Sequence, residues 1–342
     1  MKVAVVILNW NGEHMLRDFL PSVVAHSVLP ESLGEAEVYV ADNGSTDHSL
    51  ELLAHSFPTV RTIAFDQNYG FADGYNKAFE SIDAEYAILL NSDVEVTAGW
   101  LEPLVATLTN NRSVAAVAPK LRSYGYRDRF EYAGAAGGFI DFLGYPFCRG
   151  RILSTVEQDC GQYDTPRDVF WASGAAFCCR ADLFRILGGF DGDFFAHMEE
   201  IDLCWRLRSR GRRIVCVPES VVYHVGGATL NYSNPRKTFL NFRNNLLMLY
   251  KNLPQRELAS VMRVRCVLDY VAALKFLLTG CIGDFKAVIN ARREFKRIKS
   301  DYRVKRDENI AATLTEYIPE RGRFSLLWRY YACRCKHFAK LK

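Results

Sequence analysis

The chain has 342 residues, of which 49% are hydrophobic and 24% charged, so its composition excludes intrinsic disorder for most of its length. The formal net charge of +4 hides a gradient, because residues 1–110 contain 4 basic and 16 acidic residues, whereas residues 236–342 contain 24 basic and 9 acidic ones. This asymmetry predicts that the basic end faces an anionic partner, either nucleic acid or a membrane surface, unless it is simply solvated.

Short apolar runs alternate with helical patterns in the first third of the chain. Val3–Leu8 is such a run, it ends at the polar segment Asn9–Gly12, and Met15, Phe19 and Val23 then recur at helical spacing. Further runs follow at Val38–Ala41, Val60–Phe65, Ala87–Leu90 and Val114–Val117. Strands that are apolar on both faces and alternate with helices are typical of a parallel sheet covered on both sides, so the predicted fold class is α/β.

Polar residues follow four of these strands at the point where each strand ends. They are Asn9, Asp42, Asn68 and Asp93. Ligands of parallel sheets bind at the carboxyl ends of the strands. We therefore expect these four side chains to converge on one crevice, although the sequence separates them widely.

The middle of the chain is less regular. Residues 124–166 are rich in Gly, Tyr and Phe and have weak periodicity, which predicts irregular structure that shapes a pocket. Regular patterning returns at residues 169–178, and it predicts a helix near 181–187, a polar helix over 199–210 and a strand over 214–217.

The C-terminal region has the pattern of basic amphipathic helices. Over residues 264–278 the apolar residues that fall on one side of a helix are Val264, Val267, Leu268, Val271, Leu274 and Leu278. A second such helix is predicted over 284–299, and both carry too many charges to span a bilayer. Such helices commonly lie in the membrane interface, so the predicted partner is an anionic membrane surface. The alternative is that they pack on the rest of the protein with a solvated basic face; nucleic acid is disfavoured because no stacking aromatics interleave the basic residues.

Cysteine usage and the first residues predict the compartment. Ten cysteines are far below the density of a disulfide scaffold, and none forms a CxxC pair. The first residues have the pattern of a strand and not of a cleavable signal peptide. We therefore expect a cytoplasmic protein, peripheral on the inner face of the plasma membrane.

Sequence motifs disfavour several enzyme classes. No GxGxxG follows the first strand, no Gly-Lys pair forms a phosphate loop, and neither HExxH nor GxSxG occurs. Asn91–Asp93 does occur directly after an apolar run, where a hard divalent cation finds a carboxylate ligand. The alternative for this tripeptide is a turn and helix cap, and the same alternative holds for the acidic and small polar residues of Asp42–Asp47.

Four motifs in this order resemble family 2 glycosyltransferases of the GT-A fold, in particular their rhamnosyltransferase-like bacterial members. They are Val3–Asn11, Val40–Asp47, Asn68–Asn76 and Leu89–Asp93, and the likeness continues through Ser173–Ala175, Met198–Arg206 and Tyr223–His224. The resemblance implies a mostly parallel sheet flanked by helices. It also implies a nucleotide-sugar-binding half over residues 1–122, an acceptor-binding half over 123–250 and a basic amphipathic helical extension over 251–342.

The resemblance implies donor-binding roles for the matching residues. Asp42 resembles the carboxylate that contacts the nucleotide base or ribose. Amides can hydrogen-bond ribose and diphosphate without adding negative charge, and the amides in the donor-site motifs are Asn9, Asn11, Asn68 and Asn76.

The resemblance also implies a cofactor, Mg²⁺ or Mn²⁺. Asp93 resembles the last residue of the family's DxD motif, whose carboxylate contacts the metal. Asn91 stands at the first position of that motif, among the donor-binding residues, and leaves one anion fewer. His224 resembles a late histidine that completes the metal coordination in some relatives; the alternative is an ordinary imidazole after a strand. Such a cation neutralises the charge that builds on a departing nucleoside diphosphate.

An inverting transfer needs a base that removes the proton of the acceptor hydroxyl, a contribution of about 10²–10⁴-fold. Glu199–Glu200 resembles the family's acidic pair at the start of a helix, and its second member, Glu200, is the predicted catalytic base. Asp202 is the rival, two residues on and pointing elsewhere on the helix. The alternative for all three carboxylates is that they complement the helix dipole, at about 0.3–1 kcal/mol each.

The sequence thus predicts an inverting glycosyltransferase that moves a sugar from a UDP- or dTDP-linked donor to a glycan or lipid-linked acceptor in cell-surface polysaccharide biosynthesis. Rhamnose from dTDP-rhamnose is one candidate. Two alternatives stay open. The first is a sugar-1-phosphate nucleotidyltransferase, although Asn9–Gly12 is not the Gly-rich, basic loop of those enzymes. The second is a non-catalytic GT-A-like binding protein.

Overall fold

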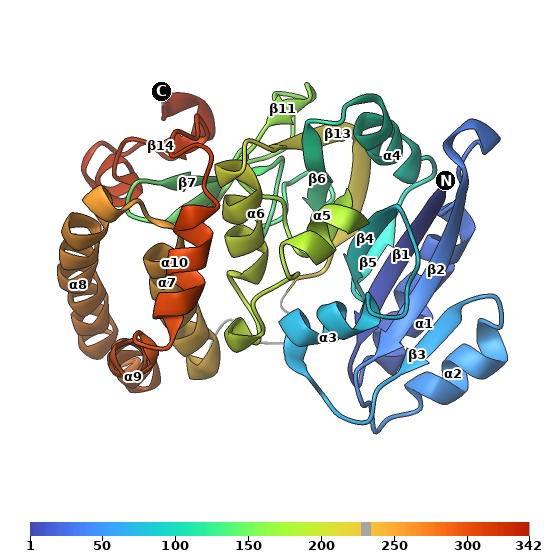
Figure 1. The fold of residues 1–342 in the computed structure, drawn as a ribbon, viewed down its shortest axis with the longest axis horizontal. Helices are drawn as coiled ribbons and strands as arrows, with labels where there is room; N and C mark the ends of the chain where they lie inside the picture. The colour runs from blue at the N-terminus through green and yellow to red at the C-terminus, as the bar shows by residue number, and fades with distance from the viewer. Residues whose placement is uncertain (227–233, 342) are drawn as a thin grey trace.

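The computed structural model describes residues 1–226 and 234–341, whose strands form two sheets. The larger sheet has nine strands in the order β11-β13-β6-β12-β4-β1-β2-β3, with β5 paired to β13 (Figure 1). Its strands are β1 Lys2–Asn9, β2 Glu35–Asp42, β3 Arg61–Ala64, β4 Tyr86–Asn91, β5 Val94–Val96, β6 Val114–Ser123, β11 Arg167–Asp168, β12 Ala176–Arg180 and β13 Arg213–His224.

The predicted α/β architecture is confirmed. Strands β1 to β4 are mutually parallel, as their continuous apolar runs predicted, but β12 lies antiparallel between β4 and β6, so the sheet is mixed. The helices that follow the strands are α1 Glu13–His26, α2 Ser49–Ser56, α3 Gly70–Ala78, α4 Leu101–Asn110, α5 Ala181–Ile186 and α6 Glu199–Ser209. Figure 1 shows α3 and α5 beside the sheet and α6 between the sheet and the C-terminal helices.

Strand β1 shows why the sheet is covered on both faces. Successive side chains of a strand point to opposite faces. Val3, Val5 and Ile7 accordingly pack in one hydrophobic cluster, whereas Ala4 and Val6 pack in another, and all five are almost fully buried. A strand buried on both faces has no polar position except at its end, which is where its functional residues lie.

The smaller sheet replaces the irregular structure expected over residues 124–166. Its strands are β7 Gly138–Asp141, β8 Pro146–Cys148, β9 Arg151–Ile152, β10 Thr155–Val156 and the distant β14 Arg321–Gly322, in the order β10-β9-β8-β7-β14. Strands of two to four residues contain too few alternations to leave a periodic signal. Over residues 169–178 the sequence predicts more regular structure than is present. Only the residues from Ala176 onward form a strand, whereas Phe170 and Trp171 are buried but belong to no strand.

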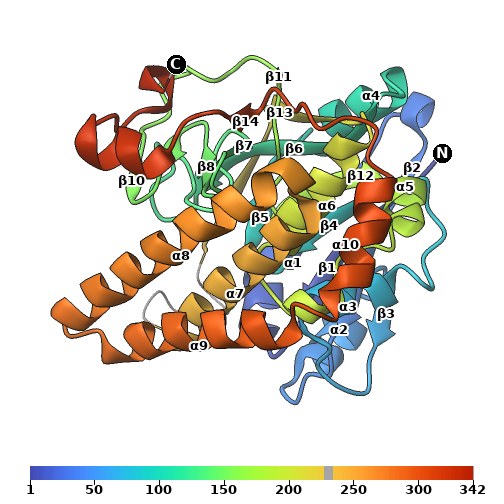
Figure 2. The same cartoon turned by 60° about the vertical axis from the view of Figure 1, so that its left-hand side comes forward.

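The C-terminal part is helical, and the helices predicted over 264–278 and 284–299 are present. The helices are α7 Pro235–Asn252, α8 Gln255–Leu278, α9 Ile282–Ile298 and α10 Tyr302–Ala311. Figure 2 shows α8 and α9 as an antiparallel hairpin beside α7. The middle of α7, Leu246–Leu249, is completely buried. Among the described helices, none has the length and hydrophobicity needed to cross a bilayer.

Candidate active site

The ends of β1 and β2 are joined by a buried pair of side chains. Asn9 and Asp42 occupy the same register position of these strands, and the Asn9 Nδ2 group donates to Asp42 Oδ2 at 3.0 Å. Asp42 Oδ1 accepts from the Ser45 amide at 2.9 Å, and both Asn9 and Asp42 are at most 1% exposed. Asn9 Oδ1 has no hydrogen-bond partner among the described residues, and a Cβ at Gly12 would lie 2.4 Å from it. The pair therefore fixes this corner of the sheet and leaves one buried acceptor unsatisfied.

Two further predicted donor-site amides, Asn11 and Asn68, lie in the loops that follow β1 and β3. Asn11 Oδ1 accepts from the Thr46 amide at 2.7 Å, and Asn68 Oδ1 accepts from the Gly70 amide at 2.7 Å. Asn43 Nδ2 also donates to Asn68 Oδ1, at 3.1 Å, which joins the ends of β2 and β3. Asn11 and Asn68 are exposed, and within the described residues neither side-chain nitrogen donates a hydrogen bond. Both side chains keep their donors for a ligand.

The structure does not bring Asn76 to these strand ends. Its Nδ2 donates to the Phe190 carbonyl and its Oδ1 accepts from the Phe190 amide, both at 2.9 Å. It lines a separate cavity of about 550 Å³, together with Asp191 and Lys305 among other residues. In this structure Asn76 therefore joins α3 to the segment before α6. Its predicted contact with the nucleotide-sugar donor stays a prediction.

The end of β4 meets the end of β13, which brings Asn91, Asp93 and His224 together. The pairing of His224 with Val94 places the imidazole Nε2 3.2 Å from Asp93 Oδ1 and 3.4 Å from Asn91 Nδ2. The Gly226 amide donates to Asp93 Oδ2 at 3.2 Å. Asp93 and His224 are each 5% exposed, so this cluster is almost completely buried at the strand ends.

Glu131 completes this cluster and was not predicted from the sequence. Its Oε1 lies 3.4 Å from His224 Nδ1, on the opposite side of the imidazole from Asp93. Burial opposes protonation of His224, but the carboxylates of Glu131 and Asp93 outweigh it and raise the pKa of the imidazole to about 10. Burial also opposes ionisation of Asp93, yet His224 holds the pKa of that carboxyl below its ordinary value. The cluster as it stands is an imidazolium between two carboxylates.

The donor atoms of this cluster fit a divalent cation. Adjacent ligands of an octahedral cation with bonds of about 2.1 Å lie about 3.0 Å apart, close to the 3.2 Å between Asp93 Oδ1 and His224 Nε2. The Asp93 carboxylate and the His224 imidazole are thus spaced as two ligands of one cation would be. Within the part of the chain that the structure describes, no three His, Cys, Asp or Glu side chains form a complete metal site.

The predicted base lies after a strained loop at the start of α6. Phe195, His197 and Met198 have φ angles of 62°, 69° and 74°, which non-glycine residues rarely adopt and which cost about 1–3 kcal/mol each. The loop is held from α7 by Asn244, whose completely buried side-chain nitrogen lies 2.8–2.9 Å from the carbonyls of Phe194, Ala196 and His197. It is also held from α3, because the Phe71 amide donates to the Phe195 carbonyl at 2.8 Å.

This loop places Glu200 beside the end of β4. A Cβ at Gly174 would lie 3.9 Å from the Glu200 Cβ, and the next carbonyl, that of Ala175, accepts from the Asn91 amide at 3.0 Å. Glu200 Oε2 has no hydrogen-bond partner among the described residues. Burial raises the pKa of Glu200 to about 7, and burial together with the charge of Glu200 raises that of Glu199 well above its ordinary value. Glu200 is therefore a proton acceptor poised near neutral pH.

The rival carboxylate, Asp202, is a structural residue. It is 0% exposed, and its Oδ2 lies 2.9 Å from Arg206 Nε and 2.8 Å from Lys251 Nζ. Its Oδ1 accepts from Asn252 Nδ2 at 2.8 Å. A carboxylate with two cations and an amide around it has no free lone pair directed at the crevice, so Asp202 cannot reach an acceptor hydroxyl.

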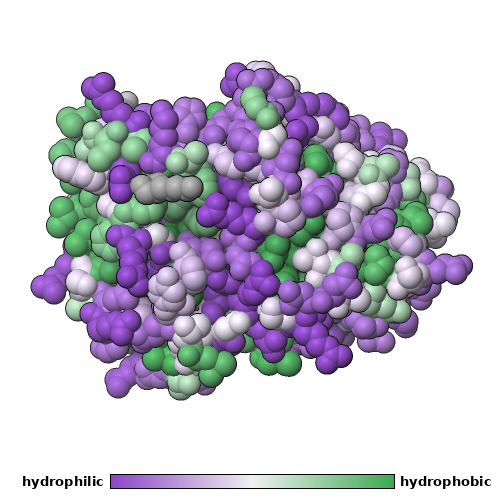
Figure 3. Space-filling view, turned by 90° about the horizontal axis from the view of Figure 1, so that it is seen from above, coloured by the Kyte–Doolittle hydropathy of each residue, from purple (hydrophilic) through white to green (hydrophobic). Residues whose placement is uncertain are grey.

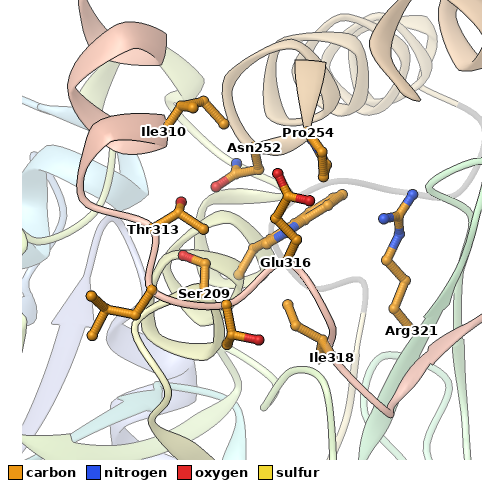
Figure 4. Close-up of a pocket in the computed structure, with 11 residues that line it drawn as sticks. Ser209, Asn252, Pro254, Ile310, Thr313, Glu316, Ile318 and Arg321 are labelled. Carbon is orange, nitrogen blue, oxygen red and sulfur yellow. The ribbon is translucent and has the colours of Figure 1, made fainter. Parts of the chain in front are cut away.

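A second cavity, of about 110 Å³, lies at the other end of α6 (Figure 4). Figure 4 shows Ser209 of α6 beside Thr313, with Ile310 of α10 above them and Glu316 and Ile318 on the segment that follows α10. Ser209 and Glu200 are nine residues apart on one helix, which is about 14 Å. This cavity is therefore separate from the crevice at the strand ends.

Sequence and fold both match known glycosyltransferases. Residues 4–163 match the model of Glycosyl transferase family 2. A sequence relative is the N-acetylglucosaminyl-diphospho-decaprenol L-rhamnosyltransferase of Mycobacterium tuberculosis, which is 29% identical over 231 residues, or 62% of this chain and 72% of the relative.

Two solved structures share the fold. S. aureus TarS in complex with UDP-GlcNAc gives a TM-score of 0.56 at 16% identity, over 90% of this chain and 89% of that one. GalNAc-T7 with UDP, GalNAc and Mn²⁺ gives a TM-score of 0.52 at 20% identity, over 65% of this chain and 43% of that one. The fold is thus the GT-A fold, and the relatives show that the protein is a glycosyltransferase that uses nucleotide sugars. The family 2 match over residues 4–163 and the named relatives identify the protein as a rhamnosyltransferase-like glycosyltransferase, which removes the nucleotidyltransferase alternative.

Proposed function

We propose that the enzyme transfers a sugar, with inversion, from a UDP- or dTDP-linked donor to a glycan or lipid-linked acceptor in cell-surface polysaccharide biosynthesis. The M. tuberculosis relative is named as a rhamnosyltransferase that acts on a decaprenol-linked sugar, which supports rhamnose as the donor sugar and a lipid-linked acceptor. We place the reaction on the cytoplasmic side, at the inner face of the plasma membrane, where such an acceptor carries its sugar.

The observation that carries this proposal is the meeting of separate strand ends at one edge of the sheet. Asn9 and Asp42 share a register position, Leu8 pairs with Asn91, and Gly174 joins the end of β4 to Glu200. In the proposed complex the nucleoside lies over β1 and β2, where Asp42 and the amides of Asn11 and Asn68 face it. The diphosphate then lies over β4.

Asp93 and His224 would hold the proposed Mg²⁺ or Mn²⁺, and the diphosphate oxygens would supply other ligands. A cation there neutralises the charge that develops on the leaving nucleoside diphosphate. Asn91 stands where the family motif has an anion. The motif therefore supplies one carboxylate to the proposed metal site, that of Asp93, and His224 would bind the metal in its neutral form. Glu131 Oε1 lies 3.4 Å from the Nδ1 atom, and its negative charge would favour this orientation of the imidazole.

Glu200 acts as the general base in this proposal. The acceptor hydroxyl oxygen bonds to the anomeric carbon while the bond from that carbon to the diphosphate oxygen breaks, and Glu200 takes the hydroxyl proton. A base works best when its pKa is near the working pH, and the pKa of about 7 meets that condition. The product is a glycoside of inverted configuration and a free nucleoside diphosphate.

The test is donor binding and turnover with a matched pair of carboxylate variants. The purified chain is screened with UDP- and dTDP-sugars for thermal stabilisation and for nucleoside diphosphate release, with and without Mn²⁺. We expect stabilisation by one donor class and metal-dependent release. Asp93→Asn should lose both, whereas Asp83→Asn, an exposed carboxylate of the same half, should lose neither. A folded protein that binds no nucleotide sugar would favour the non-catalytic alternative.

A further inference from the structure

Helix α8 is turned with its charged side inward and its apolar side outward. Its buried residues are Val261, Arg265, Asp269 and Ala273, one on each successive turn. The opposite side exposes apolar residues, of which seven are between 43% and 78% exposed: Val264, Val267, Tyr270, Val271, Leu274, Leu277 and Leu278. Hydrophobic residues also gather at the left-hand edge of the surface in Figure 3, the end of the molecule where α8 lies in Figure 1. Soluble helices have the reverse arrangement.

This orientation of α8 is fixed by buried polar contacts. Arg265 lies 3.2 Å from Asp269 and donates to the Leu143 carbonyl at 2.9 Å and to the side chain of Asn245. Arg292 of α9 approaches the other oxygen of Asp269 at 2.6 Å. A rotation of α8 that buried its apolar side would expose or break this network. The network therefore keeps the apolar side of α8 facing outward.

The α8–α9 hairpin that carries this face is strongly cationic. Nine basic and three acidic residues lie between residues 263 and 299. The acids are engaged, since Asp269 pairs with two arginines, Asp284 accepts from Thr238 and Glu294 pairs with Arg297. Six exposed cations have no acidic partner among the described residues: Arg263, Lys275, Lys286, Arg293, Lys296 and Lys299. The face thus combines exposed apolar side chains with unpaired positive charge.

We propose that the apolar side of α8, with the turn that leads to α9, binds the surface of an anionic lipid bilayer. Lipid headgroups with negative charge complement the cations, and the headgroup boundary accepts the apolar side chains, as it does for amphipathic helices. A second copy of this chain fits less well, because pairing of two like faces would bring their cations together. The bilayer is therefore the occupant that satisfies both properties of the face.

The docked face lies next to the candidate active site. A Cβ at Gly283, in the first turn of α9, would lie 2.7 Å from Pro235, the first residue of α7, and Thr238 of α7 donates to Asp284 at 2.6 Å. The guanidinium of Arg236, which follows Pro235 in α7, lies 5.0 Å from the centre of the Phe195 ring, in the loop that precedes Glu200. The bilayer would thus present a lipid-linked acceptor to the crevice, a consequence that rests on the proposed function.

Vesicle flotation of the full chain tests the docking itself. The probes are vesicles of phosphatidylcholine alone and vesicles with about one third phosphatidylglycerol. We expect flotation with the anionic vesicles and at least about tenfold less bound protein for a variant that makes three exposed positions polar. This variant is Val271→Gln, Leu274→Gln and Leu278→Gln. The matched control changes three exposed apolar residues elsewhere, Val28→Gln, Leu50→Gln and Ile186→Gln, and should float like the wild type.

Two further measurements separate the explanations. The far-ultraviolet circular dichroism and the rate of donor hydrolysis should be the same in the α8 variant and the wild type, which excludes unfolding as the cause of lost flotation. Absence of flotation in the wild type overturns the proposal, and so does a dimer in light scattering that the α8 variant dissociates. Flotation without any sugar transfer would leave the docking surface standing and remove the proposed function instead.

Discussion

The substitution Glu200→Gln should make the protein more stable above neutral pH and lower its activity strongly. Burial raises the pKa of Glu200 from 4.5 to about 7, so the folded protein holds this proton more tightly than the unfolded chain does. The resulting stabilisation is complete below pH about 4.5 and is lost as the pH rises through about 7. The pKa difference corresponds to about 3 kcal/mol, which the partial exposure of the side chain reduces to about 1–3 kcal/mol. Glutamine has nearly the same shape but does not ionise, so the Glu200→Gln protein does not lose this stability as the pH rises.

The assay is urea denaturation of both proteins at two pH values, together with nucleoside diphosphate release. At pH about 5 the two free energies of unfolding should nearly agree, and at pH about 8 the variant should exceed the wild type by about 1–3 kcal/mol. Because an amide cannot take the acceptor proton, kcat of the variant should fall by about 10²–10⁴-fold. The kcat of the wild type should rise with pH through about 7, as the carboxyl ionises.

Glu199→Gln is the matched control, because Glu199 is the adjacent carboxyl, 4% exposed, and its pKa is raised so far that it stays neutral. Its replacement should leave kcat within a few-fold, so it is the control for activity. Like Glu200→Gln, it should gain stability over the wild type as the pH rises above about 4.5, because the unfolded chain ionises this carboxyl and the folded protein does not. The reasoning about Glu200 fails if Glu200→Gln keeps wild-type activity, or if its stability relative to the wild type is the same at both pH values.

Three further outcomes are expected. Asn244→Ala should lower kcat with little change in the KM for the donor, and it should cost about 1–3 kcal/mol of stability. The reason is that the carbonyls of the strained loop lose their hydrogen-bond donor. The control Asn241→Ala, on the same helix, should change neither kcat nor stability. Asp202→Asn weakens the buried pairing with Lys251, and urea denaturation should show a loss of about 3–5 kcal/mol. Chelation with EDTA should stop nucleoside diphosphate release and Mn²⁺ should restore it, with His224→Gln raising the Mn²⁺ requirement about 10–100-fold; release that resists chelation would contradict the metal proposal.

The corner formed by β1 and β2 could be predicted because its signals are local. A continuous apolar run identifies each strand, the first polar residue identifies its end, and parallel pairing puts both ends at one edge. The bond between Asn9 and Asp42 follows from that geometry. Their roles toward a nucleotide came from the resemblance to the family and not from the geometry.

Glu131 and Asn244 could not be predicted, because what they contact is set by tertiary structure. Glu131 lies in a segment whose strands are too short to show periodicity, and its partner His224 reaches it only through the pairing of β13 with β6. Asn244 lies in α7, in a stretch of sequence that matches no recognised motif. Only the unusual φ angles of the loop in front of Glu200 show why an amide is needed there.

Helix α8 shows the same limit for an amphipathic pattern. The sequence correctly groups Val267, Val271 and Leu274 on one side, but it cannot say whether that side faces the protein or the outside. The answer depends on Arg265 and Asp269, which in the sequence are ordinary charged residues of the opposite side. Their burial against Arg292, Leu143 and Asn245 decides the orientation.

The C-terminal helices are part of the active enzyme's framework, and this determines how membrane binding has to be tested. Lys305 of α10 bonds to Asp191 at 2.7 Å, and Asn309 donates to the Lys251 carbonyl at 3.1 Å. Removing residues 259–342 would take away both contacts and expose the cation and anion network that holds α6. If a truncated chain left the membrane fraction, the cause could be disruption of these contacts as well as loss of the lipid-binding face. Substitutions confined to the outward side of α8 would change the proposed lipid contact and leave these framework contacts in place.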